Sequence, residues 1–332
     1  MFSLIADIGG THARFGLVTA KERSSRGFTI SRETKFRCAE FRHLEDALDA
    51  YLETIGRPRL TYGSIAIAAP VWNDQVRMTN LDWTFSVEAL RKRFGFQRLE
   101  VVNDASAGVL ATTCMGPEEL DEIKAGNAKA GGSRVNIIPG TGFGIGAAYS
   151  FGDKWSPVQG EGGHIGLAAL VTEEYEVLKT LAQEHGRATP ENTLSGPGML
   201  NLYYSLAKVR DIKPLDICPV EMTQLALQEK DELCHSALRI YCRLLGGLAG
   251  DYALVFGAHG GVYLSGKVLQ KLGADLLRQG FSKRFVDKGK MSSEVSNIPV
   301  HLVKRDHTGL LGAAVWLIET LDSSDEFWRV VA

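Results

Sequence analysis

The sequence predicts an α/β fold made of two similar halves. The chain has 332 residues, which is enough for about two domains. Each half opens with an apolar strand pattern that doubles back through a glycine-rich turn, at 7–12 in the first half and 140–146 in the second. Glycine-rich turns let successive backbone N–H groups face an anion. One such turn in each half indicates a duplicated fold that holds a polyphosphate from two sides.

Composition limits the class of protein. Apolar residues make up 45% of the chain and charged residues 23%, as in an ordinary globular protein. The 37 Lys and Arg nearly balance the 39 Asp and Glu, so no strong field attracts nucleic acid or an anionic membrane. The N-terminus has no signal pattern and no long apolar run follows, so we expect a cytoplasmic protein without a membrane span. The five scattered cysteines lack metal-site spacing, and we expect reduced core thiols.

The first half is predicted to contain three strands followed by alternating helices and strands. Strands are expected at 2–6, 13–18, 28–36, 64–69 and 99–102. A helix is expected at 41–55, where apolar residues recur at helical spacing. A second helix should run from the N-cap Ser86 to Phe94, with Gly95 as its stop, and a third should begin at Ser106.

The second half repeats the opening strand pair and then becomes mainly helical. Strands are expected at 134–138, 147–151, 261–264 and 299–303. Helices are expected at 172–185, 198–208, 222–228, 231–256, 268–279 and 309–321. The segment 117–132 is rich in charge, Ala and Gly, and is interpreted as a linker or surface insertion. This order differs from regular βαβ winding and from a barrel.

The first turn carries an acidic residue, Asp7, which is unusual beside a phosphate. A carboxylate there repels phosphate unless a divalent cation lies between them, and magnesium takes few carboxylates together with waters and phosphate oxygens. Thr11, at the other end of the turn, has a hydroxyl that can donate to a phosphate. The alternative is that both side chains only stabilise a hairpin turn.

Two nucleotide motifs are excluded. The glycines of the second turn alternate, so they do not form the G-x-G-x-x-G dinucleotide fingerprint. Gly261–Lys267 satisfies G-x-x-x-x-G-K, but Val268 stands where a P-loop has its magnesium-binding hydroxyl, and 262–264 has the pattern of a buried strand. We interpret this segment as a strand whose end, at Gly266, lets a nucleobase or ribose lie against bare backbone.

Polar side chains follow the strand at 99–102. Asn103 and Asp104 lie at its carboxyl end, the edge where α/β folds bind ligands. An Asp at that edge can accept a proton from an alcohol that attacks a γ-phosphate. The alternative is that Asp104 only caps the following helix.

A second polar group is predicted in the second half. Gly160–His164 is too rich in glycine for a helix or strand interior, so it forms an ordered loop that presents Glu161 and His164. Glu191 lies shortly before a turn that leads into a helix. Carboxylates and a neutral imidazole suit the hydroxyls of a polyol. A metal site is the competing interpretation of Glu161 and His164.

Taken together, these segments resemble the bacterial glucokinase family of the actin-like superfamily. The resemblance rests on Asp7–Thr11 with Arg14, Met78–Asn80 with Trp83, Asn103-Asp104, Gly140–Gly142, Gly160–His164, Leu194–Gly198 and Gly309–Gly312. It implies a two-domain actin-like ATPase (ribonuclease H-like) fold, with duplicated mixed sheets, helices and an active-site cleft between the domains. The small domain would comprise 1–110 plus 313–332, and the large domain 111–312.

The resemblance implies ATP-dependent phosphorylation of the 6-hydroxyl of D-glucose to glucose 6-phosphate, the entry step of glycolysis, by a homodimer that uses Mg²⁺. Asp104 would be the catalytic base. Asn103, Asp104, Glu161, His164 and Glu191 would bind the sugar. The nucleotide residues would be Ala6, Asp7, Ile8, Gly9, Gly10, Thr11, Gly140, Thr141, Gly142, Gly260, Gly261 and Gly266, with Asp7 at the metal.

The sequence departs from the family pattern at two positions and leaves two alternative functions. Pro139 precedes the second turn where a small residue is usual, and His12 stands where Asn is common. A related sugar-sensing repressor would need a helix-turn-helix before the first strand, and related kinases carry a Cys-rich zinc loop that this sequence lacks. A catalytically silent sugar-binding protein is disfavoured by Asp104 and the two phosphate turns.

Overall fold

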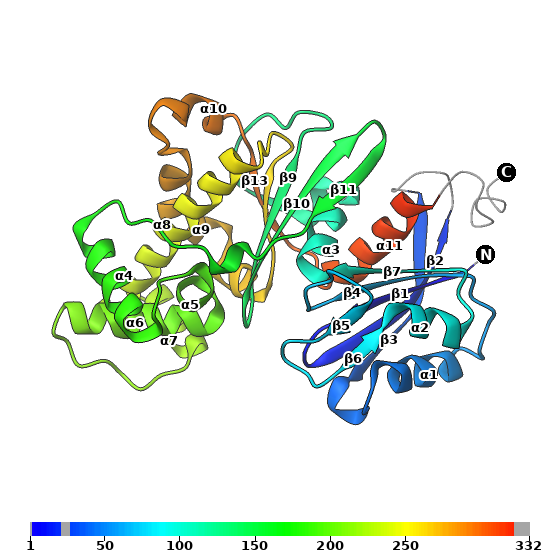
Figure 1. Cartoon of the computed structure of the whole chain (residues 1–332). Coiled ribbons are helices and arrows are strands. Elements are labelled where there is room, and N and C mark those ends of the chain that lie inside the picture. The colour runs from blue at the N-terminus through cyan, green and yellow to red at the C-terminus, as the bar shows by residue number, and fades with distance from the viewer. Residues whose placement is uncertain (1, 21–26, 322–332) are drawn as a thin grey trace. The chain divides into compact units, whose positions relative to one another are not determined.

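The computed structural model describes residues 2–20 and 27–321, which form two compact units (Figure 1). Of the described residues, unit 1 takes 2–115, 150–159 and 307–321, and unit 2 takes 116–149 and 160–306. The predicted domain boundaries at 110 and 313 stay a prediction.

Unit 1 is built on a five-stranded sheet with the order β3-β2-β1-β4-β7. The strands are β1 (Ser3–Ile8), β2 (His12–Ala20), β3 (Phe28–Arg37), β4 (Tyr62–Ile67) and β7 (Arg98–Asn103). The first three form an antiparallel meander, and β4 and β7 run parallel to β1. The residues at the carboxyl ends of β1 and β7 therefore share one edge of this sheet.

Helices cover both faces of the unit 1 sheet. They are α1 (Leu44–Thr54), α2 (Val87–Phe94), α3 (Asp104–Ala111) and α11 (Thr308–Thr320). One core contains apolar residues of α1 and α2 with Leu4 and Ala6 of β1, whereas the other contains residues of α3 and α11 with Ile5. Successive side chains of a strand point to opposite faces. The apolar run of β1 therefore supplies both cores, which explains why nearly all of it is buried.

The second sheet has six strands in the order β11-β10-β9-β12-β13-β8, and all of them except β11 and the last two residues of β10 belong to unit 2. The strands are β8 (Leu120–Lys124), β9 (Arg134–Pro139), β10 (Phe143–Phe151), β11 (Lys154–Val158), β12 (Val262–Leu264) and β13 (Val300–Val303). β10 is antiparallel to β9, and β12 and β13 run parallel to β9. The order β11-β10-β9-β12-β13 repeats that of unit 1, as the predicted duplication requires.

The helices of unit 2 pack around a long central helix, α8 (Figure 1). They are α4 (Thr172–His185), α5 (Pro190–Leu194), α6 (Gly196–Val209), α7 (Pro219–Leu227), α8 (Glu232–Val255), α9 (Lys267–Val286) and α10 (Ser292–Ser296). α9 lies very close to α8: a Cβ added at Gly246 of α8 would be only 2.8 Å from the Cα of Phe281 in α9. No helix in the described part of the chain is long and apolar enough to cross a bilayer.

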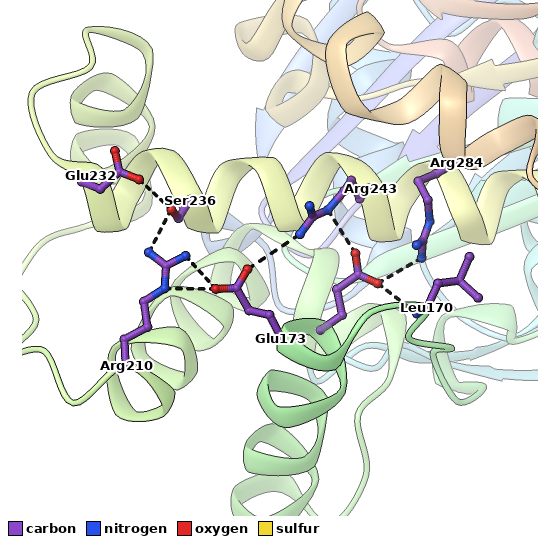
Figure 2. Close-up of polar contacts among 8 residues, drawn as sticks. Leu170, Glu173, Arg210, Glu232, Ser236, Arg243 and Arg284 are labelled. Carbon is purple, nitrogen blue, oxygen red and sulfur yellow. Dashed lines mark hydrogen bonds and ion pairs between the residues drawn. The ribbon is translucent and has the colours of Figure 1, made fainter.

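Four of these helices are joined by a chain of ion pairs (Figure 2). Arg210 Nη2 lies 2.7 Å from Glu173 Oε1, and Arg243 Nη2 lies 3.9 Å from Glu173 Oε2. Glu174 is completely buried and pairs with Arg243 Nε at 3.0 Å and with Arg284 Nη2 at 3.1 Å. The first turn of α4 is thereby fixed to α6, α8 and α9.

Most predicted helices and long strands are confirmed, with three corrections. The segment 117–132 is not only a linker, because β8 lies within it and pairs with β13. The second glycine turn is shorter than predicted, since β10 already begins at Phe143. All five cysteines are free, as expected, but Cys218 is exposed and Cys114 is half-buried, so the prediction of core thiols is wrong for these two.

Short elements account for the structure that the sequence did not predict. They are β5 (Gln75–Arg77), β6 (Thr84–Ser86), β8, β11, α5, α10 and the 3₁₀ turns η1 (Cys38–Glu40), η2 (Thr112–Cys114), η3 (Pro117–Glu119), η4 (Gly162–His164) and η5 (Gly289–Met291). β5 and β6 form a hairpin of unit 1 that contains the motif residues Met78–Asn80 in its turn. An added Cβ at Gly10 would lie 3.1 Å from the Asn80 Cβ, so this hairpin packs against the first glycine turn.

Candidate active site

The first glycine turn joins β1 to β2 and presents Asp7 at the end of β1. The Gly9 N–H donates to the His12 carbonyl at 3.0 Å, and the buried Cys38 thiol donates to the Gly9 carbonyl at 3.3 Å. Arg14, opposite Asp7 on β2, has its Nη1 3.8 Å from Asp7 Oδ2. Burial raises the pKa of Asp7 to about 6, although the Arg14 charge lowers it. The carboxylate therefore lies in a site where its negative charge is incompletely compensated.

The first turn of α11 lies against this carboxylate. A Cβ at Gly309 would be 2.5 Å from Asp7 Oδ1, which leaves no room for any side chain there. One helical turn further along, Gly312 makes backbone contact with Ala107 of α3. The Gly309–Gly312 motif thus has a physical role, since its glycines let α11 approach both Asp7 and α3 closely.

Asn103 and Asp104 lie at the junction of β7 and α3. Asn103 is the N-cap of α3: its Oδ1 accepts from Ala105 N at 3.0 Å and from Ser106 N at 3.3 Å. Its Nδ2 donates to the Ala69 carbonyl at 3.2 Å. The predicted start of this helix at Ser106 is therefore two residues too late. The alternative that Asp104 is the helix cap is also wrong, because Asn103 is the cap. Asp104 is the half-buried first residue of α3, and its Oδ1 accepts from Ala105 N at 2.8 Å.

The second glycine turn joins β9 to β10 in unit 2. Pro139 and Phe143 are paired across the hairpin, and the Gly140 N–H donates to the Gly142 carbonyl at 2.9 Å. Thr141, between these glycines, is exposed. The Phe143 N–H donates to Glu191 Oε2 at 3.1 Å. Glu191, a predicted sugar residue, is therefore bonded directly to the predicted phosphate turn.

The Gly160–His164 loop is ordered, as predicted, and ends in the 3₁₀ turn η4. The Tyr252 hydroxyl of α8 donates to the Gly162 carbonyl at 2.7 Å, and Gly163 packs against the backbone of Phe143. Glu161 and His164 are both exposed on this braced loop. Among the described residues, no three His, Cys, Asp or Glu side chains come together to hold a metal ion, so these two are not part of such a cluster.

The three glycines predicted to line the nucleoside lie at both ends of β12. Gly260 and Gly261 precede the strand, and the Gly260 N–H donates to the Ser133 carbonyl at 2.8 Å. Gly266 follows the strand with φ 104°, and a Cβ there would be 2.8 Å from the Pro139 carbonyl. Because β12 is parallel to β9, the structure brings Gly266, but not Gly260 and Gly261, beside the second turn.

A buried polar pair that the sequence did not reveal links β12 to β9. The Ser265 hydroxyl donates to Asn136 Oδ1 at 2.7 Å, and both residues are at most 2% exposed. Asn136 has a polar side chain between the apolar residues Val135 and Ile137 of its strand, and this was the only signal available in the sequence. The pair fixes Gly266 relative to the strand that ends in the phosphate turn.

The comparisons with known proteins agree with this organisation. The glucokinase family model matches residues 4–320. A glucokinase of Saccharophagus degradans is 40% identical over 95% of this chain and 97% of its own. The crystal structure of a glucokinase from an Antarctic psychrotroph is 36% identical, covers 95% of this chain and 98% of its own, and has a TM-score of 0.88.

A more distant structure shows the same fold. It is a ROK family glucokinase from Streptomyces griseus in complex with glucose and AMPPNP, with 20% identity, coverage of 96% of this chain and 99% of its own, and a TM-score of 0.62. The family model and the relatives that match over nearly their full length agree on the family of this chain. The chain belongs to the glucokinase family.

Proposed function

We propose that the protein transfers the γ-phosphoryl group of ATP to the 6-hydroxyl of D-glucose and releases ADP and glucose 6-phosphate. The observation that carries this function is the identity of 36–40%, over nearly the whole chain, with proteins named glucokinase. The carboxylate of Asp104, which directly follows the carboxyl end of β7, also supports this function. A kinase needs such a group to accept the proton of the attacking hydroxyl.

Asp104 is the proposed general base. As the 6-oxygen of the sugar forms its bond to the γ-phosphorus, the bond to the oxygen that bridges the β- and γ-phosphates breaks, and the hydroxyl proton passes to the Asp104 carboxylate. Asn103 caps α3 with its side-chain oxygen and so fixes the first turn of the helix that carries Asp104. This cap holds the base in one orientation.

The sugar ligands are proposed to be Asn103, Asp104, Glu161, His164 and Glu191. Their carboxylate, amide and imidazole groups accept from or donate to hydroxyls in fixed directions. The exposed Glu161 and His164 are held by a loop that is itself bonded to α8. A braced loop keeps these side chains in place before the sugar arrives, which reduces the entropy cost of binding.

The nucleotide is proposed to bind the backbone of Ala6–Thr11 and of Gly140–Gly142, with Gly260, Gly261 and Gly266 toward its nucleoside. Asp7 fits a divalent cation, because burial raises its pKa and its nearest cation, Arg14, is 3.8 Å away. When bound there with ATP, Mg²⁺ would supply positive charge against the triphosphate. We also propose that the protein is cytoplasmic and homodimeric.

A hexose screen tests the proposed function. ATP consumption is measured with glucose, mannose, glucosamine and fructose, each with Mg²⁺, and the sugar product is identified by ³¹P NMR. We expect the fastest turnover with glucose and a product that carries the phosphate on the 6-oxygen. Glucose binding without ATP consumption would instead support the silent sugar-binding protein.

A further inference from the structure

One short segment of unit 2 holds both ends of the second phosphate turn. Glu191 Oε2 accepts from Phe143 N at 3.1 Å, just after the turn. The Gly196 N–H donates to the Gly140 carbonyl at 2.8 Å, at the start of the turn. The carboxylate also fills the space beside Gly142, where an added Cβ would lie 2.7 Å from Glu191 Oε2.

The segment that makes these contacts is itself fixed by caps and by α8. Thr189 caps α5, accepting from Asn192 N at 3.2 Å, and Ser195 caps α6, accepting from Gly198 N at 3.0 Å. The Tyr241 hydroxyl of α8 donates to the Leu194 carbonyl at 3.0 Å. The backbone that carries Glu191 is therefore fixed to the core of unit 2. Any movement of the Glu191 carboxylate acts on the turn through its bond to Phe143 N.

We infer that Glu191 is a positioning residue that couples the sugar site to the second phosphate turn. This inference rests on the proposed function, which makes Glu191 a sugar ligand. A carboxylate has two oxygens with about four acceptor directions. It can accept from Phe143 N and from a sugar hydroxyl together, so each bond restricts the geometry available to the other. Sugar and nucleotide then strengthen each other's binding, and the coupling is reciprocal.

A pair of glycine variants in the turn tests the coupling without removing any sugar ligand. In Gly142→Ala the new methyl group must displace the Glu191 carboxylate, a flexible side-chain end, whereas in Gly140→Ala the nearest atom is 4.0 Å away. Neither glycine has a positive φ, so alanine fits both backbones. Calorimetry with glucose and no nucleotide should show binding at least about fivefold weaker in Gly142→Ala and within about twofold of wild type in Gly140→Ala. Equal glucose affinity in the two variants would overturn the inference.

The reciprocal arm measures Mg–ADP affinity without sugar. Glu191→Ala removes the bond to Phe143 N and should weaken Mg–ADP binding at least about fivefold. Glu191→Gln keeps an oxygen for that bond and should bind Mg–ADP as wild type does, and so should the control Glu122→Ala, which changes an exposed side chain of β8. Unchanged Mg–ADP affinity in Glu191→Ala would show that Glu191 is a sugar ligand only.

Failure of the proposed function gives a different pattern. If wild type neither bound nor phosphorylated glucose, the function would be wrong. The coupling would then be overturned as well, because there would be no sugar site to couple. Weakened Mg–ADP binding in Glu191→Ala alone would still show that Glu191 holds the second phosphate turn. A folded Glu191→Ala protein is verified by its thermal midpoint, and if it fails to fold, the Gly142→Ala and Gly140→Ala comparison decides the outcome.

Discussion

Asp7 and Glu174 are both acidic residues withdrawn from water, but their charges are balanced differently. Glu174 is completely buried and has two guanidinium partners, at 3.0 and 3.1 Å. Asp7 has one, at 3.8 Å, and burial raises its pKa to about 6. The difference suits their positions, because Glu174 joins helices whereas Asp7 lies at the end of β1, beside the turn that is proposed to bind the nucleotide. A deficit of positive charge at Asp7 favours a cation there.

Asp7 should make the stability of the free protein depend on pH. Its pKa is raised from 3.8 in the unfolded chain to about 6 in the folded protein, so the folded protein holds the proton more tightly. This contribution to stability is present below pH 4 and is lost as the pH rises through 6. Between pH 5 and pH 8 the free energy of unfolding of Asp7→Asn should therefore rise by about 1 kcal/mol relative to that of wild type. Urea unfolding without Mg²⁺ measures it, and a pH-independent difference would show that Asp7 is not perturbed.

Glu161 should affect the sugar more than the nucleotide. Truncation in Glu161→Ala leaves hydroxyls of the sugar without a partner, at a cost of about 1–3 kcal/mol. We expect a glucose KM raised by about tenfold or more, with the ATP KM within about threefold of wild type. Steady-state kinetics with each substrate varied in turn measures both, and Glu122→Ala, on the exposed face of β8, is the control. A preserved glucose KM would remove Glu161 from the site.

Helices whose ends are set by local chemistry could be predicted from sequence. Ser86 caps α2 by accepting from Ala89 N, and Gly95 ends it with φ 73°, both as predicted. β8 was missed because its charged sequence forms a strand only by pairing with β13, far along the chain. The bond between Glu191 and Phe143 spans 48 residues and has no local pattern, so it could not be predicted. Local signals reveal caps and turns, whereas distant partners require the folded chain.

The ion-pair chain should contribute strongly to the stability of unit 2. Glu174→Gln leaves two arginines near one another without their buried counter-charge, and breaking a buried pair costs about 3–5 kcal/mol. Glu176→Gln, two residues away on α4, removes an exposed pair with Lys179 and should cost less than about 1 kcal/mol. Urea unfolding at neutral pH compares them. A cost for Glu174→Gln no larger than that for Glu176→Gln would show that the buried pairs contribute nothing.

At the scale of the whole molecule, the duplication explains where the chemistry lies. The two sheets share an order of three meander strands followed by two parallel strands, and in each a glycine turn joins the first two meander strands along the chain, β1 to β2 and β9 to β10. The sequence predicted this repetition because glycine turns and apolar strands are local signals. The proposed base, Asp104, directly follows β7 of the first sheet, and the second glycine turn lies between β9 and β10 of the other.

The most direct test replaces the proposed base. Asp104→Asn keeps the shape of the side chain and its bond to Ala105 N, but an amide cannot accept the hydroxyl proton. At saturating glucose and Mg–ATP, the rate of glucose 6-phosphate formation should fall at least about 10²-fold, while calorimetry shows glucose affinity within about tenfold of wild type. A rate within about threefold of wild type, with the same product, would contradict general-base catalysis by Asp104.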